Sequence, residues 1–208
     1  MTAVETKERE LLTDAIFYDD TKAIEKLVAQ GVNLDERDKF GYTPLILAAN
    51  DGKIEIADLL IEKGAKLNYK SADGETALHA AIRKCDVEMT RLLLDRGALI
   101  TEKGKDGSTP LICAIVSNCL YIVELLLERG ADPDERDEQS RTAFEWATNG
   151  CEDPGIKTLM KDTGEAIQRR RADEVRAAFT AAGHTRATMQ QQLLRENFPH
   201  KLKIRAAP

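Results

Sequence analysis

The chain has 208 residues, of which 42% are apolar and 32% are charged, and its formal net charge is −6. This balance is typical of a folded domain with a packed core, and the acidic charge argues against a nucleic-acid-binding protein. No apolar run approaches 18 residues, so we expect no transmembrane helix and no membrane partner. The first ten residues, MTAVETKERE, lack the regions of a secretory signal. We therefore expect a cytoplasmic protein of one domain, or of one domain with an extension.

Cysteine and histidine give little support for a metal site or an active site. No Cys-x-x-Cys pair occurs, and a structural zinc site needs convergent Cys and His pairs at short spacing. No glycine-rich phosphate loop is present, and no motif marks a nucleophile with a base. We expect free thiols in a reducing compartment, no metal, no cofactor and no catalytic residues. The cysteines are Cys85, Cys113, Cys119 and Cys151, and the histidines are His79, His184 and His200.

The segment at residues 41–64 shows which elements to expect along the chain. Thr43 precedes Pro44 and can cap a short helix over PLILAAN, whose small alanines allow another helix to approach closely. An Asp-Gly pair then marks a turn. The run KIEIADLLIEKG has an apolar stripe and predicts a second helix, which Gly64 ends in the left-handed conformation. An extended reversing loop, AKLNYKSADG, leads to the next unit.

This unit recurs along the chain with a period of 33 residues. Gly41, Gly74 and Gly107 are 33 residues apart, and each is followed two positions later by threonine. The period continues to Thr142, with Ser140 in the place of the glycine. One unit cannot bury its apolar face alone, whereas stacked units can, so the pattern predicts a solenoid. A second glycine series with the same period closes the leucine-rich runs, at Gly31, Gly64, Gly97 and Gly130.

The segments GYTPLILAA, GETALHAA and GSTPLICAI resemble the signature of the ankyrin-repeat family, which also has a period of 33 residues. The endings LLIEKGAKLN, LLLDRGALIT and LLLERGADPD resemble its second helix and hairpin. The resemblance covers residues 5–163. It implies an all-α repeat solenoid, in which helix-turn-helix units are joined by β-hairpin loops. It also implies a non-catalytic binding scaffold, in which His79 has a structural role.

The first and last units depart from the pattern, as the terminal repeats of a solenoid do. Near the N-terminus, Glu8, Glu10 and Asp14 place charge where later units have glycine, threonine and an apolar residue. In the fifth unit, we expect Pro154-Gly155 to shorten the second helix. The prediction is an ankyrin-repeat domain of about five repeats over residues 1–163, with three regular repeats between two degenerate ones.

A basic helical extension is predicted for residues 164–208. The runs EAIQRRRADEVRAAFTAAG and TRATMQQQLLRENF each read as an amphipathic helix. From residue 156 onward there are 11 basic and 5 acidic residues, whereas the rest of the chain has a net charge of −12. Three interpretations stay open: the extension packs on the last repeat, docks a partner, or folds back over the acidic repeats. Nucleic-acid binding is a weaker alternative, because no aromatic residues interleave with the basic cluster.

The resemblance also implies where a partner binds, because hairpin tips and the exposed ends of first helices line a concave face in ankyrin repeats. Four of the ten aromatic residues lie in the first two units. We expect these four to form one exposed patch that anchors a protein partner. The alternative is that the phenylalanines pack inward and seal the end of the solenoid. The candidate concave-face residues are Phe17, Tyr18, Lys39, Phe40, Tyr42, Asn50, Asp51, Asp73, Glu75, Arg83, Lys84, Lys105, Asp106, Ser108 and Arg141.

Three classes of function follow. The leading interpretation is a monomeric, non-catalytic adaptor that binds a protein partner and no small-molecule substrate. The second is a regulator or inhibitor of a partner enzyme, with the basic tail modulating access. The third is an enzyme whose chemistry lies in residues 164–208, and so short a segment can hardly hold a preorganised site. The resemblance adds that Asn68 stands where the family's hairpin asparagine is sometimes hydroxylated.

Overall fold

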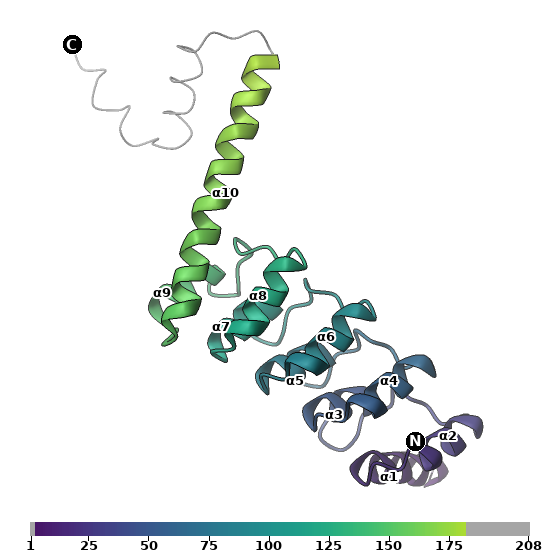
Figure 1. Ribbon diagram of the computed structural model, residues 1–208. Helices are drawn as coiled ribbons and strands as arrows, with labels where there is room; N and C mark the ends of the chain where they lie inside the picture. The colour runs from purple at the N-terminus through teal and green to yellow at the C-terminus, as the bar shows by residue number, and fades with distance from the viewer. Residues whose placement is uncertain (1–2, 182–208) are drawn as a thin grey trace, which may run out of the picture. The chain divides into compact units, whose positions relative to one another are not determined.

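The computed structural model describes residues 3–181, and these residues form ten α-helices and no β-strands. The prediction of an all-α repeat solenoid is confirmed. The chain separates into two compact units that divide between Met160 and Lys161, and each is described by itself. In the first unit the helices follow one another as stacked antiparallel pairs (Figure 1). The pairs are α1 (Ala3–Phe17) with α2 (Thr21–Ala29), α3 (Pro44–Asn50) with α4 (Ile54–Glu62), α5 (Ala77–Arg83) with α6 (Val87–Asp95), α7 (Pro110–Val116) with α8 (Leu120–Glu128), and α9 (Ala143–Asn149) with the start of α10 (Pro154–Ala181).

The threonine of each Gly-x-Thr landmark begins the first helix of its pair. In α3, α5, α7 and α9 the threonine hydroxyl accepts a hydrogen bond from the backbone N–H three residues later, at 3.2 to 3.5 Å. Such a bond satisfies one of the N–H groups that a helix start leaves unpaired. In α5 a capping box completes the arrangement, because the backbone N–H of Thr76 donates to Nδ1 of His79. His79 is buried, and that burial lowers its pKa, which suits a structural side chain.

The core runs through the stack where the first helices of successive pairs meet. Ala48, Ala80 and Ala114 are fully buried, and their small side chains allow α3, α5 and α7 to pack side by side. Leu60 and Leu93 close the core from the second helices and are also fully buried. Each pair therefore covers the apolar face of its neighbour, which is how a repeat protein without a central core becomes stable.

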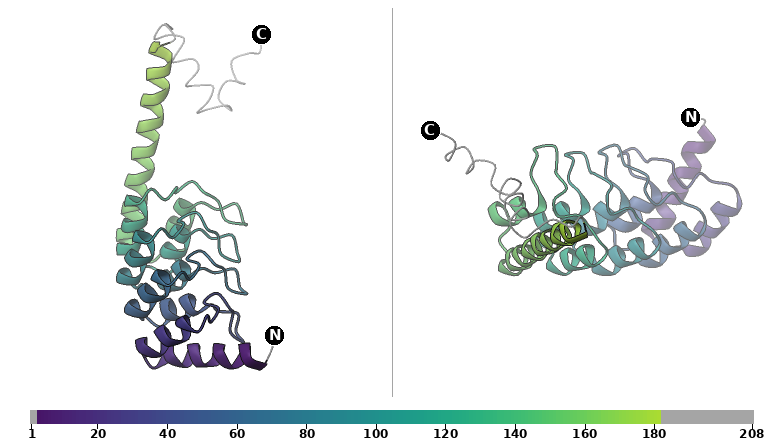
Figure 2. Two further views of the ribbon diagram at one scale, coloured as in Figure 1. Left: turned by 90° about the vertical axis from the view of Figure 1, so that its right-hand side faces the viewer. Right: turned by 90° about the horizontal axis from the view of Figure 1, so that it is seen from above.

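The reversing loops project from one side of the stack as a parallel series (Figure 2). They contain no strand among the described residues. In each loop one backbone hydrogen bond joins its two sides, in addition to the bond within the turn that it encloses. The four bonds recur every 33 residues: from Asp38 N to Tyr42 O at 2.8 Å, from Ser71 N to Glu75 O at 2.8 Å, from Gly104 N to Ser108 O at 3.0 Å, and from Asp137 N to Arg141 O at 3.0 Å.

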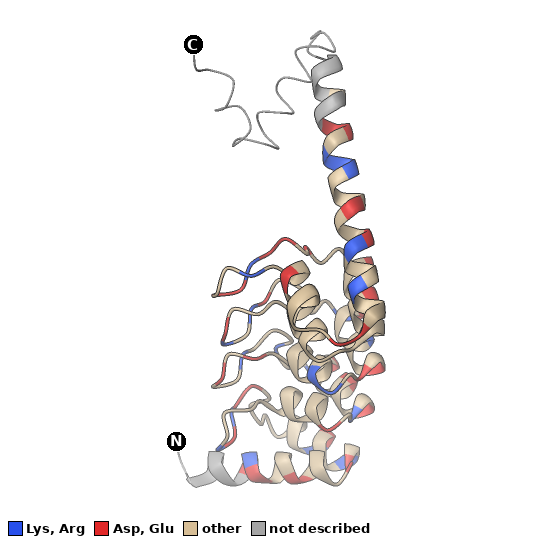
Figure 3. Ribbon diagram, turned by 90° about the vertical axis from the view of Figure 1, so that its left-hand side faces the viewer, with Lys and Arg blue, Asp and Glu red and all other residues tan. Residues whose placement is uncertain are grey.

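A series of basic side chains connects each loop to the next by hydrogen bonds. Arg37, Lys70 and Lys103 are 33 residues apart, and each side chain donates to the backbone carbonyl of the residue 33 positions later, at 2.7, 3.0 and 2.8 Å respectively. Lys70 and Lys103 also pair with Glu102 and Glu135, at 2.9 and 3.3 Å. Basic and acidic residues therefore alternate closely along the loops (Figure 3). These bonds join neighbouring repeats by polar contacts in addition to the apolar core.

The fifth unit differs from its prediction. Pro154 does not shorten the second helix but starts α10, which continues for 28 residues. A proline in the first helical turn lacks only an N–H that would be unpaired there anyway. Asp153 completes the start, because its Oδ1 accepts from the backbone N–H groups of Gly155 and Ile156, at 2.6 and 3.3 Å. The first helix predicted for the extension lies within α10 up to Ala181, and the second lies outside the described residues.

Candidate functional site

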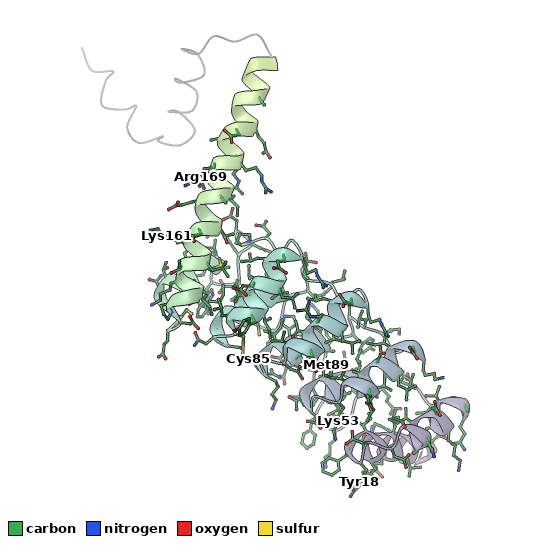
Figure 4. All side chains as sticks on the ribbon, in the orientation of Figure 1. Tyr18, Lys53, Cys85, Met89, Lys161 and Arg169 are labelled. Carbon is green, nitrogen blue, oxygen red and sulfur yellow. A yellow bond between two sulfur atoms is a disulfide. The ribbon has the colours of Figure 1, made fainter. Side chains whose placement is uncertain are left out.

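The aromatic residues of the first two repeats divide into two groups. Phe17, Tyr18 and Phe40 are 63%, 74% and 64% exposed, so neither phenylalanine packs inward. Phe17 is the last residue of α1 and Tyr18, labelled in Figure 4, follows it. Their rings lie edge to face with the ring centres 5.1 Å apart. Tyr42 is half-buried and packs against the core. We call Phe17, Tyr18 and Phe40 the exposed aromatics. Because so much of their apolar surface meets solvent, they are natural anchors for another molecule.

The charged candidates lie on the loops and at the ends of the first helices, mostly as pairs. Lys39 Nζ lies 5.0 Å from the centre of the Phe40 ring. Glu75 is paired with Arg83 within one repeat, and Asp73 with Lys105 across two repeats at 3.3 Å. These partners are half-buried or exposed, so the pairs contribute little to stability and stay available to a partner.

The remaining candidates occupy different environments. Asn50 Nδ2 donates to Asp51 Oδ1 at 3.1 Å, and both residues lie at the end of α3. Asp106 is exposed, but its Oδ1 accepts from the backbone N–H of Ser108 at 3.2 Å. Ser108 itself is buried, with only 9% of its surface exposed, so it offers little contact area to a partner. Lys84 is exposed after the end of α5.

Arg141 belongs to a network that the sequence did not reveal. Its neighbour Asp137 is buried, and Oδ1 accepts from the backbone N–H groups of Gln139 and Arg141, at 2.9 and 2.8 Å. The other oxygen, Oδ2, accepts from Trp146 Nε1 at 2.9 Å and Arg141 Nε at 3.3 Å. The Arg141 guanidinium also stacks over the Trp146 ring at 3.7 Å. Burial raises the pKa of Asp137, but the hydrogen bonds from Arg141 and Trp146 outweigh it, so the pKa lies below its ordinary value.

The substitution Asp137→Asn is expected to destabilise the last repeat. An amide loses the charge that Arg141 and Trp146 face, so we expect the free energy of unfolding to fall by about 2 kcal/mol near neutral pH. Because the pKa of Asp137 is lowered in the folded protein, its carboxylate stabilises the fold at pH values above the unfolded-state pKa. This stabilisation is lost as the pH falls through the folded-state pKa. The difference between wild type and variant, measured by urea unfolding, should therefore shrink below about pH 4. A constant difference down to pH 2 would contradict the assignment.

The turns that join the two helices of each pair also stack on one another, so that residue i of one turn lies beside residue i+34 of the next. We call this series the turn column. Asp19 and Lys53 form an ion pair there, and Cys85 and Cys119 form a disulfide with their Cα atoms 5.5 Å apart. Figure 4 labels Lys53 and Cys85. The expectation of free thiols is therefore wrong for Cys85 and Cys119. The missed signal was their separation of 34 residues, one more than the repeat, because stacking brings such positions together.

Three further features concern metal binding, the membrane and Asn68. No group of three or more His, Cys, Asp or Glu side chains in this part of the chain could hold a metal ion. No helix described there is long and apolar enough to cross a membrane. Asn68 is engaged structurally, because its Oδ1 accepts from the backbone N–H of Leu99 at 2.9 Å. What the fold presents is therefore a row of loops and helix ends with three exposed aromatics at one end.

Stacked helix pairs, capped by threonine and joined by projecting loops every 33 residues, define a helical solenoid of short repeats. Comparison with protein families gives a match to a model of ankyrin repeats (3 copies), at residues 12–104, 70–137 and 99–171. The chain belongs to the ankyrin-repeat family. Ankyrin repeats are generally protein–protein interaction modules and typically non-catalytic scaffolds. A comparison with curated proteins gave no match.

Proposed function

We propose that this protein is a non-catalytic, cytoplasmic adaptor that binds a protein partner through the loop and helix-end surface of its repeats. The exposed aromatics Phe17, Tyr18 and Phe40 carry the proposal, because each leaves more than 60% of its surface in solvent. Aromatic side chains supply large contact area at little entropic cost, and they dominate the energetics of protein interfaces. The charged pairs on the neighbouring repeats form a polar surround that selects among partners.

A second function is the regulation of a partner enzyme. In this alternative the repeats of residues 1–163 occupy the surface of an enzyme, and the basic extension of residues 164–208 modulates access to it. Charge favours the idea, because the region from residue 156 onward has 11 basic and 5 acidic residues against an acidic remainder. Attraction between segments of opposite charge weakens with salt, so the regulatory effect would do so as well.

The test is quantitative capture of partners from native lysate, with the triple variant Phe17→Ser, Tyr18→Ser, Phe40→Ser compared with wild type. Each anchor is worth about 2 kcal/mol or more, so losing one weakens a true partner about 30-fold. We expect partners held by wild type to be absent from the variant. Thermal unfolding should stay nearly unchanged, because exposed side chains contribute little to stability.

Tyr121→Ser is the matched control. Tyr121 is 73% exposed, like the exposed aromatics, but it lies on α8, the second helix of its pair. The control should retain every partner that wild type captures. Equal capture by the triple variant and wild type would overturn the aromatic anchor. Deletion of residues 182–208 then separates the two functions, because altered inhibition of a captured enzyme favours the regulator and unaltered binding favours the adaptor.

A further inference from the structure

The disulfide between Cys85 and Cys119 occupies a place where the other repeats use non-covalent contacts. In the first repeats the turn column holds the Asp19–Lys53 ion pair. After the disulfide, Asn118 accepts from the Cys151 thiol and from the backbone N–H of Asp153, both at 3.1 Å. Stacking alone brings these positions together, so the fold does not depend on a covalent bond at this point. Both the bonded and the reduced form of the cysteine pair are therefore compatible with the repeat geometry.

The two sulfur atoms differ in access. Cys85 is exposed in the turn after α5, whereas Cys119 is only 6% exposed at the start of α8. Cys85 is therefore the more accessible of the two residues to an external thiolate. In the reduced form, two carbonyl oxygens can accept a hydrogen bond from the Cys119 thiol. Ser117 O lies 3.3 Å and Ile82 O lies 3.5 Å from Cys119 Sγ. Ser117 O also lies 3.5 Å from Cys85 Sγ, so reduction leaves neither sulfur without a hydrogen-bond acceptor.

Cys119, whose sulfur would leave in such an attack, lies at the start of a helix. It is the N-cap of α8, a helix of nine residues, and no side chain caps that helix. At the equivalent position of two other repeats, Asp20 and Asp86 carry carboxylates that accept backbone N–H groups of α2 and α6, both at 2.9 Å, whereas α4 has Lys53 there. The starts of α2 and α6 thus hold an anion, and helix N-termini in general favour the thiolate form of cysteine. The start of α8 would stabilise a thiolate that leaves on Cys119 Sγ, whereas the burial of Cys119 opposes that charge.

We propose that Cys85 and Cys119 form a thiol-exchange site, at which a low-molecular-weight thiol of the glutathione class forms a mixed disulfide with Cys85. The attacking thiolate bonds to Cys85 Sγ while the bond to Cys119 breaks, and its electron pair leaves on Cys119 Sγ, which takes a proton from water. A second thiol then attacks the mixed disulfide and releases Cys85 as a thiol. Overall, the protein disulfide is reduced to two thiols and two small thiols are oxidised to one small disulfide. Oxidation by that small disulfide is the reverse.

The site lies beside residues of the proposed binding surface. Cys85 directly follows Arg83 and Lys84, and all three are exposed. A mixed disulfide there would place a bulky, carboxylate-bearing group next to two cations, where it would mask their charge. The redox state of the pair would thus change the part of the surface that the third repeat offers to a partner. This inference extends the proposed function, but the chemistry itself needs no partner.

The other two thiols are poorly suited to the exchange. Burial raises the pKa of the Cys113 thiol to about 11, so little thiolate is present near neutral pH. Cys151 is buried and its thiol donates to Asn118 Oδ1 at 3.1 Å. Because the reactive species is the thiolate and access is needed, adducts should concentrate on Cys85. Cys113 and Cys151 thereby serve as internal controls within the same chain.

The experiment equilibrates the purified full chain with mixtures of reduced and oxidised glutathione, traps free thiols by acid and alkylation, and maps adducts by mass spectrometry. We expect the Cys85–Cys119 disulfide in oxidising mixtures, two thiols in reducing mixtures, and a glutathione adduct on Cys85 in between. The adduct should be at least about tenfold more abundant on Cys85 than on Cys119, Cys113 or Cys151. No disulfide in oxidising mixtures, or an even spread of adducts, would overturn the proposal.

Two variants separate the steps. Cys119→Ser removes the thiol that displaces the adduct, so the glutathione adduct on Cys85 should accumulate several-fold above wild type. Cys85→Ser should abolish the adduct while its circular dichroism stays that of a folded helical protein. An adduct that persists in Cys85→Ser, or does not rise in Cys119→Ser, would contradict the assignment. Failure of the partner-capture test would leave these results unaffected, because no partner is present.

Discussion

The substitution Cys85→Ser is expected to lower the free energy of unfolding of the oxidised protein by about 3 to 4 kcal/mol. The disulfide closes a loop across 34 residues of sequence, and its removal returns that loop's conformational entropy to the unfolded chain. Cys85 is exposed, so the serine creates no cavity, and the Cys119 thiol keeps carbonyl oxygens as acceptors. Urea unfolding of wild type and variant, both without reductant, measures the difference.

Reduction of the wild type provides the control. With a reducing agent present, wild type and Cys85→Ser should unfold with free energies that agree to within about 1 kcal/mol, because both lack the covalent loop. Equal stability of the two proteins without reductant would mean that the bond does not form in solution. The comparison needs no partner and no knowledge of function.

The substitution Gly107→Ala is expected to cost about 2 to 4 kcal/mol of stability. Gly107 has a φ of +72°, which already costs an alanine about 1 kcal/mol. Its added Cβ would also lie 2.7 Å from the backbone nitrogen of Glu138 and 2.6 Å from Glu138 Cγ. The Glu138 N–H donates to Asp106 O at 3.3 Å, so the neighbouring loop cannot retreat without losing a bond between repeats. Such overpacking typically costs a further 1 to 3 kcal/mol of stability, and we expect about 2 kcal/mol at Gly107.

Gly130→Ala is the matched comparison. Gly130 has a φ of +86°, and a Cβ there would meet no atom within 4 Å. We expect a loss of about 1 kcal/mol, from backbone strain alone. Thermal or urea unfolding of the two variants isolates the cost of the contact between repeats. A similar loss in both would show that the loops at Gly107 are not packed as closely as the structure has them.

Local signals predicted the elements well where they act within one unit. The Gly-x-Thr landmark gave the helix starts, because Thr43 and its equivalents cap through a bond that spans only three residues. Pro154-Gly155 predicts a shortened second helix, which is wrong, because Asp153 and Pro154 start α10 through equally local bonds. The expected exposure of Phe17 and Phe40 is seen, but that of Tyr42 and Ser108 is not. Burial of these two depends on what the adjacent loop covers, which a single unit does not show.

The sequence by itself determined the period, the helix pairs and the family, because a 33-residue pattern of glycine, threonine and leucine acts through bonds and apolar faces within each unit. Only the tertiary structure decided which residues meet between units. It shows that Cys85 bonds to Cys119 and that Arg141 stacks on Trp146. It also shows that Gly107 packs closely against the next loop and that Gly130 does not, although both glycines look like ordinary turn residues in the sequence. The reason is geometric. Contacts between units depend on how each repeat is offset from the repeat it stacks on, and the pattern within one unit does not specify that offset.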